Sequence, residues 1–115
     1  MATVLIVDDD VDFREALEEA LLGEGFDVCV AGDADEACRL VSGRPIDVVV
    51  SDIRMPGDGA TLPKRLPRPV ILMTAFEEPG TRERVLWDGA VAYLNKPISL
   101  TELRRHIMTA LARHA

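Results

Sequence analysis

Acidic side chains stand at the ends of two apolar runs in this sequence. Asp8 and Asp9 follow Val4–Val7, and Asp52 lies just beyond Val48–Val50. Because the carboxyl ends of parallel strands open into one crevice, we predict that these carboxylates converge there. Neighbouring carboxylates resist ionising together, and a divalent cation with oxygen ligands relieves that repulsion best. Such a cation would leave a carboxylate at its side that can accept a phosphoryl group.

A hydroxyl and an ammonium group stand at two further strand ends. Thr74 closes the apolar run Val70–Met73, and Lys96 and Pro97 come soon after Ala92–Leu94. Neither residue is informative alone, since most threonines at strand ends are ordinary strand residues and most lysines are exposed. Together with the acids they make a set of groups suited to phosphoryl transfer, in which positioning and charge neutralisation dominate.

The order of the elements predicts how these ends come together. Short apolar runs alternate with helical patterns, which is typical of repeated βαβ units around a parallel sheet. The runs 48–50 and 70–73 lack polar alternation, as expected for strands that are covered on both faces. We therefore predict an α/β fold, a doubly wound five-stranded parallel sheet that occupies residues 1–115 as one domain, with strands at Thr3–Val7, Asp27–Val30, Ile46–Ser51, Val70–Thr74 and Ala92–Leu94.

Three predicted helices have clear start or stop signals. The first ends near Gly23 and carries an apolar stripe made by Phe13, Leu17, Ala20 and Leu21. The second begins with Asp33 as its N-cap. The last begins after a capping box made by Ser99 and Glu102. Its buried stripe is predicted to comprise Leu100, Leu103, Ile107 and Leu111.

The connection between the third and fourth strands has little room for a helix. Residues 53–68 exceed the minimum of about a dozen for a parallel crossover, but a Pro-Gly-Asp-Gly run and two further prolines interrupt them. Residues 60–66 therefore form two helical turns at most. We expect the sheet face beneath this connection to be thinly covered. We hypothesise that the resulting apolar patch contacts a partner or a second copy of the chain.

Composition limits the class of partner. The chain has 115 residues and a formal net charge of −7, which argues against a bare nucleic-acid or anionic-membrane surface. No apolar span is long enough for a transmembrane helix, and the N-terminal apolar run is too short for a signal peptide. We therefore expect a cytoplasmic protein in which Cys29 and Cys38 are free thiols.

The set of two leading acids, a central acid, a hydroxyl and a lysine-proline pair resembles the receiver domain of bacterial response regulators, over nearly the whole chain. The resemblance implies a flavodoxin- or CheY-like sheet of strand order 2-1-3-4-5, with a shortened third crossover helix in this chain. It implies that Asp52 accepts a phosphoryl group from a phosphohistidine of a sensor histidine kinase or phosphotransfer protein. Mg²⁺ would be held by Asp8, Asp9, Asp52 and the backbone carbonyl of Arg54.

The same resemblance assigns roles to the remaining strand ends. Thr74 would be the switch hydroxyl that moves inward to hydrogen-bond a phosphoryl oxygen, and Lys96 would pair with that group as a point charge. A cis peptide bond before Pro97 is expected to aim the lysine amine. Tyr93 stands where the family has an aromatic side chain whose rotamer follows the threonine. An ordinary strand tyrosine is the equally weighted alternative.

Three residues near the acids are expected to control access to the site and the lifetime of the acyl phosphate. Arg54 and Phe76 lie two positions after Asp52 and Thr74 and would flank the entrance. Ala75 is small where the family needs access to the acid. We predict that Phe76 screens water from the acyl phosphate.

The resemblance also predicts the partners. The protein would be a phosphorylation-controlled switch rather than an enzyme, although it assists its own phosphorylation and dephosphorylation. The expected output face comprises residues 81–89, 92–94 and 100–112, through which it would contact a partner protein or form a homodimer. The motifs are most like those of receivers in transcription activators, but no direct nucleic-acid or membrane contact is expected. Whether the receiver acts alone or belongs to a longer regulator stays open.

Two other classes of function are open alternatives. A binding module that keeps the fold without phosphorylation would suit the shortened crossover, which alters the loop after Asp52. An aspartate-nucleophile phosphohydrolase would place its nucleophile at Asp8 or Asp10, but it leaves Lys96 and Pro97 without a role. Incubation with a small phosphodonor and Mg²⁺ separates a receiver from a binding module, because a pure binding module gains no phosphoryl group. Replacing Asp52 by asparagine separates a receiver from a hydrolase, because labelling would vanish in a receiver and persist in a hydrolase.

Three further residues are expected to have no catalytic role. His106 and His114 lie on or near the last helix and have no base-orienting partner in view, so we expect them at the surface. Trp87 falls within the fourth predicted helix and is expected to pack against the core.

Overall fold

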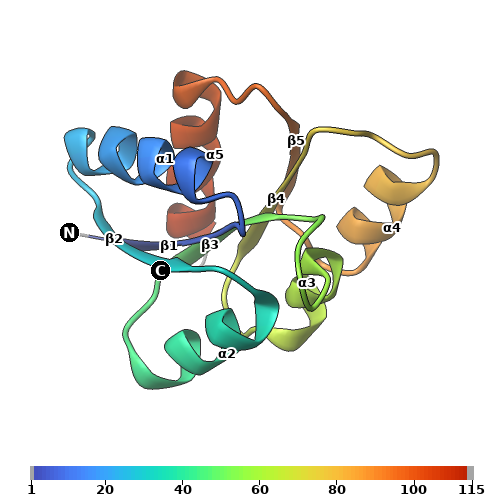
Figure 1. The fold of residues 1–115 in the computed structure, drawn as a ribbon, viewed down its shortest axis with the longest axis horizontal. Coiled ribbons are helices and arrows are strands. Elements are labelled where there is room, and N and C mark those ends of the chain that lie inside the picture. The colour runs from blue at the N-terminus through green and yellow to red at the C-terminus, as the bar shows by residue number, and fades with distance from the viewer. Residues whose placement is uncertain (1, 114–115) are drawn as a thin grey trace.

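The computed structural model describes residues 2–113 and contains one sheet of five parallel strands in the order β2-β1-β3-β4-β5 (Figure 1). The strands are β1 Thr3–Val7, β2 Asp27–Ala31, β3 Val48–Asp52, β4 Val70–Thr74 and β5 Ala92–Asn95. The helices are α1 Val11–Gly23, α2 Ala34–Gly43, α3 Leu62–Arg65, α4 Thr81–Trp87 and α5 Leu100–Arg113, with a 3₁₀ turn, η1, at Gly59–Thr61. The predicted α/β class, strand order and parallel pairing are confirmed. None of the described helices is long and apolar enough to cross a membrane.

The helices cover both faces of the sheet, as Figure 1 shows: α1 and α5 lie on one face and α2, α3 and α4 on the other. Alternate residues of β1 serve the two layers, since Val4 and Ile6 pack with α1 and α5 while Leu5 and Val7 pack with the opposite helices. All five residues of β3 and of β4 are buried. Burial on both faces explains why these strands show no polar alternation.

The predicted helix starts are confirmed by side-chain caps. The Asp33 carboxylate accepts a hydrogen bond from the Glu36 amide at 2.7 Å, and the Ser99 hydroxyl accepts one from the Glu102 amide at 3.2 Å. Asp10 caps α1 in the same way, by accepting from the Phe13 amide at 3.2 Å. These caps satisfy amide groups that have no partner within their own helix.

The start of β3 differs from the prediction. The ladder between β1 and β3 begins with the pair Val4 and Val48, so Ile46 lies outside the strand. Ile46 is nevertheless 1% exposed, because it packs into the core from the loop before β3. The buried apolar segment therefore begins before the hydrogen-bonded strand does, so the apolar pattern of the sequence could not show where β3 begins.

The connection from β3 to β4 is short in helix, as predicted, but the sheet beneath it is well covered. Leu62 is fully buried and Leu66 is 9% exposed, and both pack with Val49 and Leu72 of the strands. The short connection covers the sheet because it lies very close to it: the backbone of Gly59 lies directly on the backbone of β3. The hypothesis of an apolar patch at this connection is therefore wrong.

The expectation that Trp87 packs against the core is also wrong. Its side chain is 90% exposed, and Val85 is the only buried residue among the seven of α4. Trp87 follows Val85 by two positions, which places it about 200° around the helix axis from the buried face. Cys29 and Cys38 are free thiols, as predicted, and both are partly buried.

Candidate functional site

Backbone pairing brings the predicted residues to one edge of the sheet. The hydrogen-bond pattern of the strands continues one residue past their ends, from the Asp8 amide to the Ala31 carbonyl at 3.0 Å and from the Lys96 amide to the Thr74 carbonyl at 2.8 Å. Asp52 ends β3 and pairs with Met73 in the register of β4. The ends of four strands are thus held level, with their functional side chains at the same edge.

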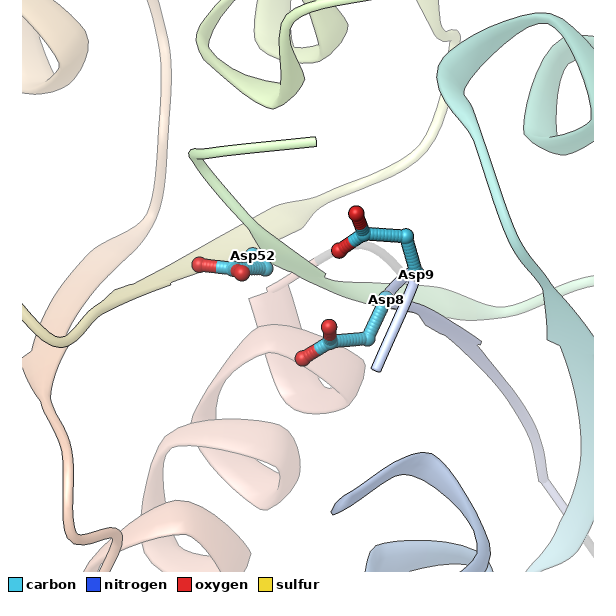
Figure 2. A group of neighbouring side chains, drawn as sticks. All are labelled: Asp8, Asp9 and Asp52. Carbon is cyan, nitrogen blue, oxygen red and sulfur yellow. The ribbon is translucent and has the colours of Figure 1, made fainter. Parts of the chain in front are cut away.

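The three predicted acids come together there. Asp8, Asp9 and Asp52 each offer a carboxylate oxygen, and these oxygens all lie within 4.8 Å of one another. Figure 2 shows Asp8 and Asp9 at the end of β1 beside Asp52 at the end of β3. Asp8 is fully buried, Asp52 is 8% exposed and Asp9 is exposed. A set of oxygen ligands from carboxylates fits Mg²⁺ and offers nothing to a softer metal.

Lys96 lies between the two buried acids. Its Nζ is 3.0 Å from Asp8 Oδ2 and 3.6 Å from Asp52 Oδ2. The peptide bond between Lys96 and Pro97 is cis, as predicted. The ammonium group also lies 3.9 Å from the centre of the Phe13 ring, an aromatic contact that the sequence analysis missed because Phe13 was assigned only to an apolar stripe. The lysine is therefore held by two anionic groups and one ring face.

Asp52 is easier to protonate than an ordinary aspartate. Burial raises the pKa of Asp52, and the neighbouring Asp8 carboxylate raises it further. Lys96 and the backbone amides of Arg54 and Ile53 oppose this rise without cancelling it. The site thus holds a carboxylate whose charge is incompletely neutralised by the protein.

Within residues 2–113, neither Thr74 nor Tyr93 forms a hydrogen bond with the three acids. The Thr74 hydroxyl donates to the Phe76 carbonyl at 2.9 Å and accepts from the Phe76 amide at 3.1 Å. Tyr93 is 4% exposed, which is deeper than the half-buried strand tyrosine of the alternative reading. The Thr74 hydroxyl is therefore bonded to the loop after β4 and not to the acids.

Arg54, Phe76 and Thr74 line a pocket of about 320 Å³ between the loops that follow β3 and β4. The Arg54 guanidinium lies 5.4 Å from the centre of the Phe76 ring, so these two residues meet as predicted. Arg54 also forms an ion pair with Glu78, which the sequence analysis missed. Phe76 itself is 68% exposed, and Ala75 is exposed next to it.

The one histidine within residues 2–113 does not belong to the acidic cluster. His106 lies on α5, 3.9 Å from Glu102 of the same helix. His114 lies outside the described residues. Asp10, one of the two nucleophiles of the hydrolase alternative, uses its carboxylate to cap α1.

Comparison with known proteins decides the family. A family model described as response regulator receiver domain matches residues 4–108. The chain belongs to the response regulator receiver family. Among solved structures, this receiver is similar to a response regulator receiver domain protein from Clostridium thermocellum, with a TM-score of 0.92 and 26% identity over 98% of this chain and 96% of that one. It is also similar to the beryllofluoride-activated NtrC4 receiver domain dimer, with a TM-score of 0.91 and 27% identity over 100% of both chains.

Curated relatives place the receiver among two-component response regulators. The protein PetR of Rhodobacter capsulatus is 41% identical over 96% of this chain, and NtrC of Salmonella typhimurium is 34% identical over 96%. The receiver spans 48% of the length of PetR and 25% of the length of that NtrC.

Proposed function

We propose that this receiver accepts a phosphoryl group on Asp52 from a phosphohistidine of a sensor histidine kinase or phosphotransfer protein, and that the modified form controls a partner. The observation that carries the proposal is the position of Lys96 between Asp8 and Asp52, with Nζ 3.0 Å and 3.6 Å from their carboxylates. A buried aspartate with a cation and two further acids at one strand edge is arranged for phosphoryl transfer, which depends on positioning and charge.

The chemical step needs little from the protein beyond alignment. A carboxylate oxygen of Asp52 attacks the phosphorus, the phosphorus–nitrogen bond to the donor breaks, and the donor imidazole keeps the electron pair. Lys96 donates hydrogen bonds to the transferred oxygens from its place beside Asp52. Asp8, Asp9, Asp52 and the Arg54 backbone carbonyl would hold Mg²⁺, which supplies neutralisation of the phosphoryl charge when it is bound.

The switch would begin at Thr74. Its hydroxyl would give up its hydrogen bonds with the Phe76 backbone and bind a phosphoryl oxygen. The Tyr93 side chain would then move into the space that the threonine leaves. Arg54, Ala75 and Phe76 control access to the acyl phosphate and its lifetime, with Phe76 screening water. Support comes from the pocket of about 320 Å³ where Thr74, Arg54 and Phe76 meet.

The output face would be formed by α4, β5 and α5. Two of these elements carry exposed apolar side chains, Leu86 on α4 and Met108 on α5, which a bound partner would cover. A second copy of the chain is one such partner, since the similar NtrC4 receiver domain is described as a dimer. We expect the protein to act in the cytoplasm without contacting nucleic acid or membrane itself.

Intact mass after treatment with acetyl phosphate tests the proposal. The wild type should gain one phosphoryl group in the presence of Mg²⁺ and none in the presence of a chelator, and Asp52→Asn should gain none. Asp12→Asn, an exposed aspartate of α1, is the matched control and should label like the wild type. Label that persists in Asp52→Asn would support the hydrolase alternative, and a wild type without label would support the binding module.

A further inference from the structure

The Lys96 ammonium group has a third neighbour besides its two acids. A lysine carries three N–H donors and no acceptor. The carboxylates of Asp8 and Asp52 engage it from two sides, with Nζ 3.0 Å and 3.6 Å from their Oδ2 atoms. On another side lies the face of the Phe13 ring, whose centre is 3.9 Å from Nζ. The lysine side chain is left only 17% exposed, so the ring stands where water would otherwise reach the ammonium group.

The packing of α1 does not by itself require an aromatic ring at residue 13. Phe13 is the third residue of α1, is only partly buried, and packs with the apolar cluster that joins α1, α5 and the sheet. A leucine or a methionine would fill this place in the apolar stripe of the helix. Neither offers the negative face of an aromatic ring, which attracts an ammonium ion. The contact with Lys96 is therefore what distinguishes phenylalanine at this position.

A closed set of contacts ties the ring back to the acid at the end of β1. The Asp10 amide donates a hydrogen bond to Asp8 Oδ1 at 3.0 Å, and the Asp10 carboxylate accepts one from the Phe13 amide at 3.2 Å. The Phe13 ring lies on Lys96, and Lys96 donates to Asp8 Oδ2 at 3.0 Å. Supporting contacts of this kind restrict the orientations of a side chain more than the ion pair alone does.

We infer that Phe13 is a positioning residue for Lys96, and that its ring keeps the ammonium group between Asp8 and Asp52 instead of letting it turn towards water. Two ion pairs fix a lysine poorly, because its ammonium is a point charge on a flexible stem of four carbons. The ring face adds a third fixed point. The holding contact stands by itself, whereas its effect on phosphoryl transfer rests on the proposed function.

Under that function the ring would affect the rate of transfer and not the binding of metal. Lys96 has to meet the oxygens of the incoming phosphoryl group, and displacement of a group that stabilises transferred charge slows such a step. Phe13 offers no ligand atom to the acidic cluster. The Mg²⁺ concentration that gives half of the maximal rate should therefore stay the same when the ring is lost.

The test uses the fact that the chain has only two lysines, Lys64 and Lys96. With isotope-labelled lysine each gives its own Cε signal in NMR, and Lys64, whose side chain is 67% exposed, is the internal reference. In wild type the order parameter of Lys96 Cε should exceed that of Lys64. It should fall towards the value of Lys64 in Phe13→Leu and stay as in wild type in Phe13→Tyr. An unchanged order parameter in Phe13→Leu would overturn the inference.

Phe26→Leu is the matched control. It removes a ring from the same apolar cluster, next to the start of β2 and thus at the opposite end of the strands from Lys96. It should lower the stability of the fold and leave the Lys96 signal unchanged. An equal fall of the Lys96 order parameter in both variants would reduce the effect to lost packing and overturn the inference. Circular dichroism shows that each variant is folded, and Phe13→Met replaces Phe13→Leu if that variant is not.

The time course of labelling by acetyl phosphate is the second readout. At saturating Mg²⁺ the rate should fall by about three- to fivefold in Phe13→Leu and recover in Phe13→Tyr. A rate equal to that of wild type, or a fall confined to low Mg²⁺, would overturn the role of the ring in transfer. A wild type that takes up no label would contradict the proposed function instead, and the order parameter of Lys96 would still decide whether Phe13 holds the lysine.

Discussion

At the scale of single residues, the protonation of Asp52 depends on how much positive charge lies near its carboxylate. Burial and the Asp8 carboxylate favour the protonated form of Asp52, and Lys96 offsets only part of this because it is closer to Asp8, at 3.0 Å against 3.6 Å. The ionised aspartate therefore destabilises the fold until further positive charge arrives. This imbalance leaves the site ready to gain from a divalent cation.

The free energy of unfolding should show this imbalance. The folded-state pKa of Asp52 is raised, so the folded protein binds the proton more tightly than the unfolded chain does. Stability is lost as pH rises from the ordinary aspartate range through the folded pKa, and it stays lost above that value. Without divalent cations, Asp52→Asn should therefore be more stable than wild type at neutral pH, and the difference should vanish in acid.

Urea denaturation across this pH range measures the effect. Asp12→Asn is the matched control, and because Asp12 lies in the first turn of α1 its loss should cost stability slightly. An Asp52→Asn variant that is less stable than wild type at neutral pH would show that attraction by Lys96 outweighs burial.

The meeting of Asp8, Asp52 and Lys96 could be predicted from the sequence, but the side chains that contact the candidate site residues could not. Asp8, Asp52 and Lys96 stand at strand ends, and parallel pairing alone brings strand ends together. The contacts of Phe13 with Lys96 and of Arg82 with Tyr93 join different elements through side-chain rotamers. Periodicity reports which face of an element is apolar and carries no information on such contacts.

At the scale of elements, the alternation of apolar runs and helical stripes predicts the fold. The prediction fails where a glycine or a short helix decides how the chain packs on the sheet. The connection after β3 was expected to leave the sheet exposed. Gly59 prevents this, because a Cβ built on it would lie 1.9 Å from the Asp52 carbonyl oxygen. Only a residue without a side chain lets η1 lie directly on the strand that carries Asp52.

Gly59→Ala should therefore harm both the fold and the site. The added methyl group has to push η1 away from β3, and we expect a loss of about 2 kcal/mol in the free energy of unfolding. Because the displaced atoms belong to Asp52 and Ile53, labelling by acetyl phosphate should slow as well. Thermal denaturation and the time course of labelling measure the two effects.

Gly43→Ala is the matched control for this change. No atom lies within 4 Å of the added Cβ at the end of α2, so the free energy of unfolding should change by less than about 0.5 kcal/mol. Equal stability of the two variants would contradict the close contact between η1 and β3.

At the scale of the whole molecule, an excess of acids acts against the folded state. The chain has 20 acidic and 13 basic side chains, and three of the acids meet at the edge of the sheet. Sodium chloride should stabilise the fold weakly by screening this repulsion. Magnesium chloride should do more, because a bound ion stabilises the folded state by about 2.7 kcal/mol at a hundredfold excess over its Kd.

Melting temperatures in the two salts at equal ionic strength separate screening from binding. The extra stabilisation by Mg²⁺ should disappear in Asp9→Asn, because this exposed carboxylate belongs to the cluster and forms no hydrogen bond or ion pair with another side chain in residues 2–113. The same gain from both salts would mean that the acids bind no specific ion.

The ion pair between Asp8 and Lys96 spans 88 positions of the chain. A nascent polypeptide emerging from the ribosome presents the first of these residues long before the second. Until β5 has docked, Asp8 and Asp52 lack the ammonium group of Lys96, so a half-made chain has an incomplete site. Under the proposed function, the ability to accept a phosphoryl group would therefore arise only when synthesis has reached β5.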